Sequence, residues 1–592
     1  MSKKMEIKKG IGVSPGYRIR RAFVLEEEDT TVPARFLSPK QDVESEIERF
    51  HEALKASIRD LEDLKQEIRK KLSPDLQEIF SVHQILLSDP AIRQKVEEKI
   101  RNHRCTAEYA LTRTMRSYIR KFRSFRNNLF SNRSQDIRDL EKRVLRHLQG
   151  KKRKGINDLK EEVIVIAKDL LPSQTATFDK KHVVGFATDF GGKTSHTAIL
   201  ARAFGIPAVV GVGDLTAQVS NDDIVVIDGT NGLVILNPDE KTLKRYQQKE
   251  RQHADFWNRL YTELKDLPCE TLDGYEIKLW ANIEVPQEVS LAVENGAEGV
   301  GLYRTEFLYL QSGKVPSEKE HLNAYLQALQ ELKGRPLVIR LLDMGADKYH
   351  HRSAPLQEKN PFLGCRSIRY LFEELDILKV QLRAILRASA HGDVRILLPM
   401  ISSVEELEQA KTILEDIQEE LHKQHLAFDE NIKVGIMIEV PSAVLIADVL
   451  AQKVDFFSIG TNDLIQYTLA VDRVNEKVAF LYQPAHLSIL RMLQHVVEVG
   501  KKNAIPVSIC GEMSREMRYV LPLLGLGLTN ISMTPVVIPE VKKIIRSTTL
   551  KEAKEVFEKI LSFQTSEETE KFLETKIQQM VPDIFEVLQP TI

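Results

Sequence analysis

Cysteine is scarce in this sequence. Four cysteines are scattered over 592 residues: Cys105, Cys269, Cys365 and Cys510. Their spacing matches neither a zinc site nor a disulfide framework, which excludes a small disulfide-stabilised secreted protein. Thiols kept apart in this way are typical of a reducing compartment, so we expect a cytoplasmic protein.

Long apolar runs and a dominant charge are also missing. No apolar segment is long enough to span a bilayer, and residues 1–6 lack the apolar core of a signal peptide. The 84 Lys and Arg residues nearly balance the 85 Asp and Glu residues, which removes any global argument for a nucleic-acid or membrane partner. The composition is that of an ordinary soluble globular protein, and the length predicts roughly three or four domains.

The most informative stretch is Gly-Gly-Lys-Thr-Ser-His-Thr-Ala at 191–198. The apolar run 183–187 predicts a strand before it, a helix follows, and the glycine pair allows a tight turn between the two. Thr194 or Ser195 suits the N-cap of that helix. His196 would then lie at a helix N-terminus, where free N–H groups and the helix dipole favour an anion.

A neutral imidazole is a nucleophile, and its phosphorylated product is anionic. A lone histidine on a glycine turn is more often a packing or capping group, but the glycines, hydroxyls and helix start together favour a phosphoryl-carrying His196. The stretch resembles the phosphohistidine signature shared by Enzyme I of the phosphoenolpyruvate–sugar phosphotransferase system, pyruvate phosphate dikinase and phosphoenolpyruvate synthase. Its Thr197-Ala198 ending is most similar to Enzyme I.

Around this signature we expect a multidomain α/β protein. Residues 1–35 and 151–238 predict a swivelling α/β domain that carries His196, with a helical subdomain inserted at 36–150. Within that insert, apolar residues recur every three or four positions. Residues 239–268 predict a linker helix. Strands of the α/β domain are expected at 162–167, 183–187, 207–212 and 224–228.

Residues 269–592 predict a (β/α)8 barrel, because apolar strand candidates alternate with amphipathic helices. An eighth, short strand is expected between Pro361 and Leu371. In such barrels the chemistry lies at the carboxyl ends of the strands. The seven clear strand candidates are 277–283, 299–304, 337–343, 394–400, 434–439, 456–460 and 506–510.

Reactive side chains recur where these strands end. Arginines such as Arg304 and Arg340 hold oxyanions with forked hydrogen bonds, and carboxylates such as Glu439 and Asp463 are the oxygen ligands that Mg²⁺ prefers. Any one of them could be a structural ion pair or a helix cap. Their recurrence at one edge favours a site for a small phosphorylated acid, formed by Arg304, Arg340, Glu439, Asn462, Asp463, Arg473 and Cys510.

The segment Gly-Thr-Asn-Asp-Leu at 460–464, followed by Asp472-Arg473, resembles the phosphoenolpyruvate-binding barrel of Enzyme I, and the resemblance covers essentially the full chain. It implies that Cys510 protonates the enolate to give pyruvate and that His196 accepts the phosphoryl group. It also implies a homodimer formed through the barrel, with Arg366 as a weaker candidate for the site. The substrate and metal ligands that it implies are Arg304, Arg340, Asn462, Asp463 and Arg473 for phosphoenolpyruvate, and Glu439 and Asp463 for Mg²⁺.

The resemblance further implies that His196 passes the phosphoryl group to a histidine of an HPr-like phosphocarrier, which docks on the helical subdomain. Residues 113–154 are densely basic, whereas the family offers an acidic surface there. A solvated helix face would explain the basic residues without a function. Otherwise we expect a carrier whose docking surface is less basic than is usual.

Two other functions stay open. A dikinase or synthase would need a nucleotide-binding domain before the phosphohistidine domain, but the residues before 151 predict helices and contain no glycine-rich phosphate loop. A regulatory phosphocarrier relative without turnover is the second alternative. The presence of Arg304, Glu439, Asp463 and Cys510 argues against it.

Overall fold

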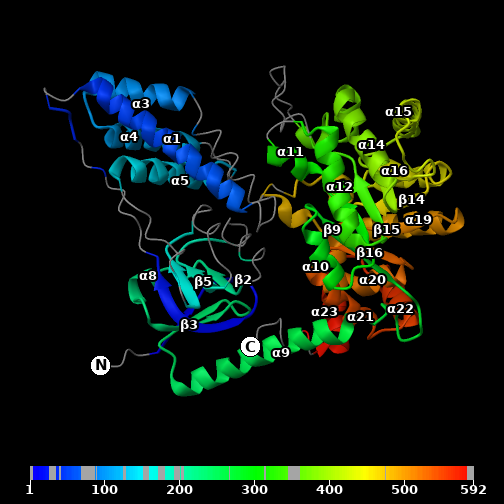
Figure 1. Cartoon of the computed structure of the whole chain (residues 1–592). Coiled ribbons are helices and arrows are strands. Elements are labelled where there is room, and N and C mark those ends of the chain that lie inside the picture. Colours follow the sequence, from blue (N-terminus) through cyan, green and yellow to red (C-terminus); the bar gives the residue numbers. More distant parts are fainter. Residues whose placement is uncertain are drawn as a thin grey trace. The chain divides into compact units, whose positions relative to one another are not determined.

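A computed structural model describes residues 5–25, 32, 35–38, 42–68, 87, 90–124, 129–150, 159, 161–170, 181–192, 201, 206–265, 267–312, 315–344, 360–473, 475, 477–582 and 584. The chain forms two compact units, which divide between Phe256 and Trp257. Figure 1 shows the elements of both units. None of the helices in these ranges combines the length and the apolar character that crossing a membrane requires.

The first unit contains an eight-stranded sheet in the order β1-β8-β7-β3-β4-β5-β6-β2. Its centre is parallel from β3 to β6, and the flanking pairs are antiparallel. All five residues of β4 are buried, which explains the continuous apolar run in the sequence. The strands are β1 (Glu6–Lys9), β2 (Ile11–Ser14), β3 (Tyr17–Val24), β4 (Val163–Ala167), β5 (Val183–Thr188), β6 (Ala208–Val210), β7 (Ile224–Asp228) and β8 (Leu233–Leu236).

The predicted helical insert is confirmed. Its apolar stripes meet in one core, in which Phe50, Val96, Leu111 and Val144 are almost fully buried. Pro90 opens a helix, where its missing N–H costs nothing, while Pro74 lies outside the described residues. The helices are α1 (Val43–Ile68), α3 (Pro90–His103), α4 (Ala107–Ser124) and α5 (Leu129–Gln149).

The predicted linker helix is α9 (Glu240–Leu264). Its first half is tied to the sheet, because the buried hydroxyl of Tyr246 donates to Oδ2 of Asp228 at 3.0 Å. Asp228 also fixes the turn after β7 by accepting the backbone N–H of Asn231 at 2.8 Å. The helix therefore starts from a rigid anchor.

The second unit contains a closed barrel of eight parallel strands, as the sequence predicts. Its interior is filled by side chains from successive strands, among them Trp280, Leu302, Met437 and Phe456. The strands are β9 (Lys278–Ile283), β10 (Val300–Tyr303), β11 (Leu337–Arg340), β12 (Val394–Leu398), β13 (Lys433–Ile438), β14 (Phe456–Ile459), β15 (Val507–Ile509) and β16 (Asn530–Met533).

The predicted position of the eighth strand is wrong. Residues 361–371 form a 3₁₀ turn, η3 (Pro361–Leu363), and the start of helix α13 (Ile368–Glu373). The eighth strand is β16, which pairs with both β15 and β9 and closes the barrel. Proline and glycine disfavour a strand at 361–364, while β16 is so short that periodicity alone cannot reveal it. Cys510 therefore follows the seventh strand rather than the last.

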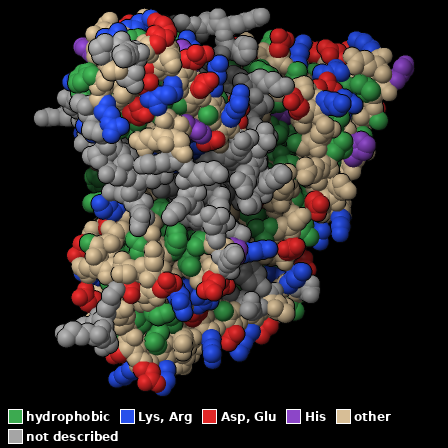
Figure 2. Space-filling model, turned by 60° about the vertical axis from the view of Figure 1, so that its left-hand side comes forward, with side chains coloured by type: hydrophobic (Ala, Val, Ile, Leu, Met, Phe, Trp, Pro, Cys, Tyr) green, Lys and Arg blue, Asp and Glu red, His purple; other side chains and the backbone are tan. Residues whose placement is uncertain are grey.

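Helices cover the outside of the barrel, in agreement with the amphipathic helices that the sequence predicts between its strands. Figure 2 shows that cationic and anionic side chains are interspersed over one face of the described residues and do not gather into a patch of one sign. The helices around the barrel include α11 (Glu306–Ser312), α12 (Glu318–Leu332), α14 (Leu375–Ser389), α15 (Val404–Lys423), α16 (Pro441–Leu445) and α18 (Thr461–Leu469).

Candidate functional site at the carboxyl ends of the barrel strands

Most of the predicted site residues lie together. Arg304 directly follows β10, Arg340 ends β11, and Glu439 directly follows β13. The first turn of α18 carries Asn462 and Asp463, immediately after β14. Parallel strands bring these ends to one mouth of the barrel, with Cys510 after β15.

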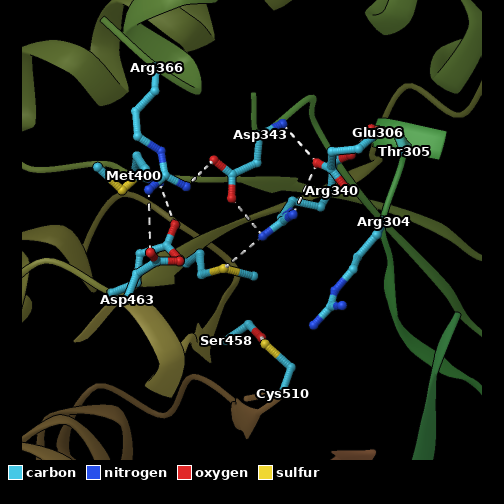
Figure 3. Close-up of polar contacts among 12 residues, drawn as sticks. Arg304, Thr305, Glu306, Arg340, Asp343, Arg366, Met400, Ser458, Asp463 and Cys510 are labelled. Atoms are coloured by element: carbon cyan, nitrogen blue, oxygen red, sulfur yellow. Dashed lines mark hydrogen bonds and ion pairs between the residues drawn. The ribbon is translucent and has the colours of Figure 1, made fainter. Parts of the chain in front are cut away.

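Arg340 is the central cation of this mouth. One Nη donates to Oε1 of Glu306 at 3.0 Å, and the other pairs with Oδ2 of Asp343 at 2.9 Å (Figure 3). Its Nε is buried without a partner among the described residues. Burying a hydrogen-bond donor without a partner costs free energy. The Nε of Arg340 is therefore available to donate to an oxyanion.

Asp343 joins two arginines. Its second oxygen pairs with Nη2 of Arg366 at 2.9 Å, and its side chain is only 4% exposed. Although burial alone would raise the pKa of Asp343, the charges of Arg340 and Arg366 hold it at about 2. The carboxylate therefore stays ionised and fixes both guanidinium groups.

Arg366 extends the chain of charges to Asp463. Its Nη1 lies 3.4 Å from Oδ1 of Asp463 and donates to the hydroxyl of Tyr467 at 3.2 Å. The next residue, Ser367, has a φ of +59°, a strained conformation for a residue other than glycine. The surrounding structure must hold this strained backbone next to Arg366.

Glu439 is buried beside Asp463. Its Oε1 accepts the N–H of Met400 at 2.7 Å, and Met400 itself has a φ of +56°. Burial, together with the carboxylates of Asp463 and Asp343, raises the pKa of Glu439 well above its usual range. Bringing a cation to this pair would favour ionisation of Glu439.

Arg304 has a different partner from the other two arginines. Its Nη1 donates to Oε1 of Glu284, at the end of β9, at 3.0 Å. Its side chain is about one-third exposed, far more than those of Arg340 and Arg366. Arg304 is therefore the most accessible of these three cations.

Asn462 and Arg473 complete the predicted set. Oδ1 of Asn462 accepts the N–H of Glu512 at 2.8 Å, an arrangement in which the amide nitrogen keeps its role as a donor. Arg473 is exposed and is linked to the cluster through Tyr482, whose hydroxyl donates to the carbonyl of Asn462 at 3.4 Å. Burial raises the pKa of Tyr482 to about 12, although Arg473 opposes the shift.

Cys510 lies at the floor of the mouth and is 2% exposed. Burial raises the pKa of its thiol, so the thiol is protonated at neutral pH. The next residue is Gly511, where an added Cβ would come within 1.7 Å of Thr461 Oγ1. This close approach requires glycine and brings the β15 end against α18.

His196 lies outside the described residues. Two parts that lead to it are described: β5 ends at Thr188, and Gly191 turns the chain with a φ of +126°, as predicted for this glycine. Asp189 is buried and accepts the N–H of Thr216 at 3.1 Å. This bond fixes the strand end from which the loop starts.

Several neighbours that the sequence prediction did not name hold the site. Glu306, Asp343 and Glu284 pair with its arginines, and Ser458 contacts Cys510. The signal for Glu306 and Asp343 was present, since both follow the same strands as Arg304 and Arg340. Ser458 lies inside β14, and a single serine within a strand gives no sign in the sequence that it contacts a functional residue.

The residues present suit a divalent cation bound together with substrate. The described part of the chain contains no group of three or more His, Cys, Asp and Glu side chains that could hold a metal ion alone. Mg²⁺, however, is commonly held by one or two carboxylates and substrate oxygens. An added Cβ at Gly460 would lie 2.8 Å from Glu439 Oε2, so glycine keeps the space beside this oxygen.

Two comparisons with known proteins agree over most of the chain. Models of the PEP-utilising enzymes match in three parts: the N-terminal domain at 9–133, the mobile domain at 159–232 and the PEP-binding domain at 258–550. Similar relatives named phosphoenolpyruvate-protein phosphotransferase come from Bacillus subtilis and Geobacillus stearothermophilus. The Bacillus subtilis protein is 44% identical over 96% of this chain and 99% of its own length. The Geobacillus stearothermophilus protein is also 44% identical, over 95% of this chain and 97% of its own length.

Proposed function

The chain belongs to the family of PEP-utilising enzymes, and on that premise we propose that it is a phosphoenolpyruvate-protein phosphotransferase. It transfers the phosphoryl group of phosphoenolpyruvate to its own His196 and then to a histidine of an HPr-like phosphocarrier, releasing pyruvate. This is the first step of a phosphotransferase system. The observation that carries the proposal is the set of buried arginines and carboxylates around Cys510 at one mouth of the barrel.

The arginines bind the substrate. Phosphoenolpyruvate carries a phosphate and a carboxylate, which suit the forked donors of Arg304 and Arg340. The unsatisfied Nε of Arg340 and the unsatisfied hydroxyl of Thr461 are buried donors that the described residues leave without a partner. Asn462 and Arg473 add donors at the rim, and Asp463 lies among them.

Glu439 and Asp463 would hold Mg²⁺. Their hard carboxylate oxygens, the raised pKa of Glu439 and the space at Gly460 support this choice. The ion would neutralise charge on the phosphoryl group. The described residues act around it: Met400 orients Glu439 through its N–H, and Arg366 holds Asp463.

Cys510 gives the proton that completes the reaction. Loss of the phosphoryl group leaves an enolate, and a protonated thiol at the floor of the mouth can donate to its carbon. Since burial raises the pKa of Cys510, the acid form is present at neutral pH. The enolate is thereby trapped as pyruvate.

Transfer of label from phosphoenolpyruvate tests the proposal. Wild-type protein with Mg²⁺ is expected to take up acid-labile, base-stable label, and His196→Ala none. Folded wild type that stays unlabelled would instead favour the regulatory relative. Equal labelling of both proteins would mean that a residue other than His196 carries the phosphoryl group.

The carrier is proposed to dock on the helical insert through a surface less basic than is usual. Arg113 and Arg116 are exposed on α4, whereas Arg143 on α5 is 4% exposed, so part of the basic character is internal. Binding of carriers with basic and neutral docking faces, compared in low and high salt, tests this. Tight, salt-sensitive binding of the basic carrier would contradict it.

A homodimer through the barrel is also proposed. Leu363, Leu445 and Phe480 expose large apolar side chains, each about 70% exposed, on segments that follow barrel strands. Exposed apolar side chains of this size favour association, and light scattering after size exclusion measures it. A cytoplasmic location is proposed as well, supported by the four free cysteines.

A further inference from the structure

Ser458 and Cys510 form a buried pair on neighbouring strands of the barrel. Ser458 lies in β14, Cys510 directly follows β15, and they are 1% and 2% exposed. The hydroxyl of Ser458 donates to the sulfur of Cys510 at 3.3 Å (Figure 3). We propose that Ser458 is a positioning residue for the proton transfer, whose hydroxyl orients the sulfur and stabilises it once the proton has left.

The position of the sulfur is fixed by the strands around it. The thiol donates to the carbonyl of Ile459 at 3.5 Å, and the same carbonyl accepts the N–H of Cys510 at 3.1 Å. On the other side, Nδ2 of Asn282 donates to the carbonyl of Cys510 at 2.9 Å. The backbone therefore sets where the sulfur lies, and Ser458 supplies a hydrogen bond to it.

The hydrogen bond from Ser458 and the nearby charges all influence the pKa of Cys510, and they do not all act in the same direction. Burial is the largest influence and raises the pKa of Cys510, and the carboxylate of Glu439 acts in the same direction. The hydroxyl of Ser458 and the charges of Arg340 and Arg304 oppose the rise. In a site this dry, the hydroxyl takes the place of a hydrating water molecule.

The inference rests on the proposed function and concerns its last step. The electron pair of the enolate forms a bond from C3 to the thiol hydrogen. The S–H bond breaks, its electrons stay on sulfur, and the enolate oxygen becomes the ketone oxygen of pyruvate. The hydroxyl of Ser458 keeps its own proton and donates to the thiolate, and water restores the thiol afterwards. Hydrogen bonds to charged groups are stronger than those to neutral ones, so the stabilisation grows toward the transition state.

The chain offers a matched control in Ser508. It is the register partner of Ser458 across β14 and β15, is 7% exposed, and donates its hydroxyl to the carbonyl of Phe457 at 3.3 Å. Ser508→Ala thus removes a buried hydroxyl from the same strand pair without touching the sulfur. Both variants are compared by single-turnover pyruvate formation, detected with lactate dehydrogenase, and by labelling of His196.

We expect Ser458→Ala to lower the rate of pyruvate formation about 10- to 100-fold, the value of a hydrogen bond to a charged group. The KM for phosphoenolpyruvate and the rate of Ser508→Ala are expected to stay near wild type. In a Cys510→Ala background, Ser458→Ala should not lower the rate of pyruvate formation further, because its effect acts through the sulfur. A purely structural role would lower the rate equally in both backgrounds.

The outcomes separate the inference from the function it rests on. Unlabelled wild type overturns the proposed function and the inference together. A labelled wild type in which Ser458→Ala matches Ser508→Ala, or in which the loss persists without Cys510, overturns the inference alone. If Ser458→Ala does not fold, Ser458→Cys is close in volume with a weaker donor. It is then expected to give an intermediate rate, and a wild-type rate would contradict the inference.

Discussion

Arg366 forms an ion pair with Asp463, with Nη1 and Oδ1 3.4 Å apart. The guanidinium of Arg366 thus lies beside the carboxylate of Asp463, which is proposed to bind the metal. The same guanidinium holds Asp343 at 2.9 Å, so Arg366 connects the arginine side of the mouth with its carboxylate side. We therefore expect a ligand bound on one side of the mouth to affect binding on the other.

Arg366→Lys tests this connection. An ammonium group is a point charge and cannot bridge both carboxylates as the forked guanidinium does. We expect phosphorylation by phosphoenolpyruvate to slow about 10- to 100-fold, measured by label uptake. The control is Arg395→Lys, because Arg395 pairs with Asp393 at 2.7 Å near the amino end of β12. Equal rates for the two variants would show that the bridge has no role.

Asp343→Asn is expected to lower the free energy of unfolding by about 3 kcal/mol, because it removes the carboxylate charge that the two buried guanidinium groups of Arg340 and Arg366 share. The pKa of Asp343 is about 2, below about 3.9 in an unfolded chain. Its stabilisation is thus fully present above about pH 4 and is lost as the pH falls toward 2. Urea unfolding of both proteins between pH 7 and pH 3 should show a constant difference that shrinks only at the acidic end.

Gly460→Ala is expected to weaken metal binding, since the added Cβ would lie 2.8 Å from Glu439 Oε2. Mn²⁺, titrated in place of Mg²⁺ and followed by electron paramagnetic resonance, measures the affinity without any turnover. We expect a loss of about tenfold or more, the scale of damage to groups that orient ligands. Unchanged Mn²⁺ affinity would mean that the metal lies elsewhere.

His321 predicts a second pH effect, away from the site. It is fully buried in α12, and its Nδ1 lies 2.9 Å from the hydroxyl of Tyr325. Burial lowers its pKa to about 4, below about 6.5 when unfolded. The unfolded state therefore binds the proton more readily, and stability is lost as the pH falls from 6.5 toward 4. From pH 7 to pH 5 we expect wild type to lose about 2 kcal/mol more than His321→Gln; parallel curves would contradict this.

The sequence predicted the barrel because its helices and most of its strands are strongly periodic. It also predicted that Arg304, Arg340, Glu439, Asp463 and Cys510 would share one mouth, since the ends of parallel strands converge. The position of β16 was not predictable in this way, because four residues with a polar first position give no clear period. Likewise β8, directly after a turn, was not predicted.

The ion pairs inside the site could not be predicted from the sequence, for a different reason. Nothing in the spacing of Asp343 and Arg366 reveals that they meet, because the two residues are 23 positions apart in the sequence and tertiary packing brings them together. Buried Arg143 illustrates the same limit in the helical insert, where a basic stretch reads as a solvated face. Contacts made by tertiary packing override local pattern in both cases.

The closure of the barrel has a consequence for biosynthesis. Trp280 in the first barrel strand is the register partner of Ser532 in the last, so a ribosome must release most of the chain before the ring can close. Until then β9 has an unpaired edge, and a nascent edge of this kind is prone to pairing with other chains. Mutations that weaken β16 should therefore reduce the yield of newly made protein more than they reduce the activity of the molecules that have folded.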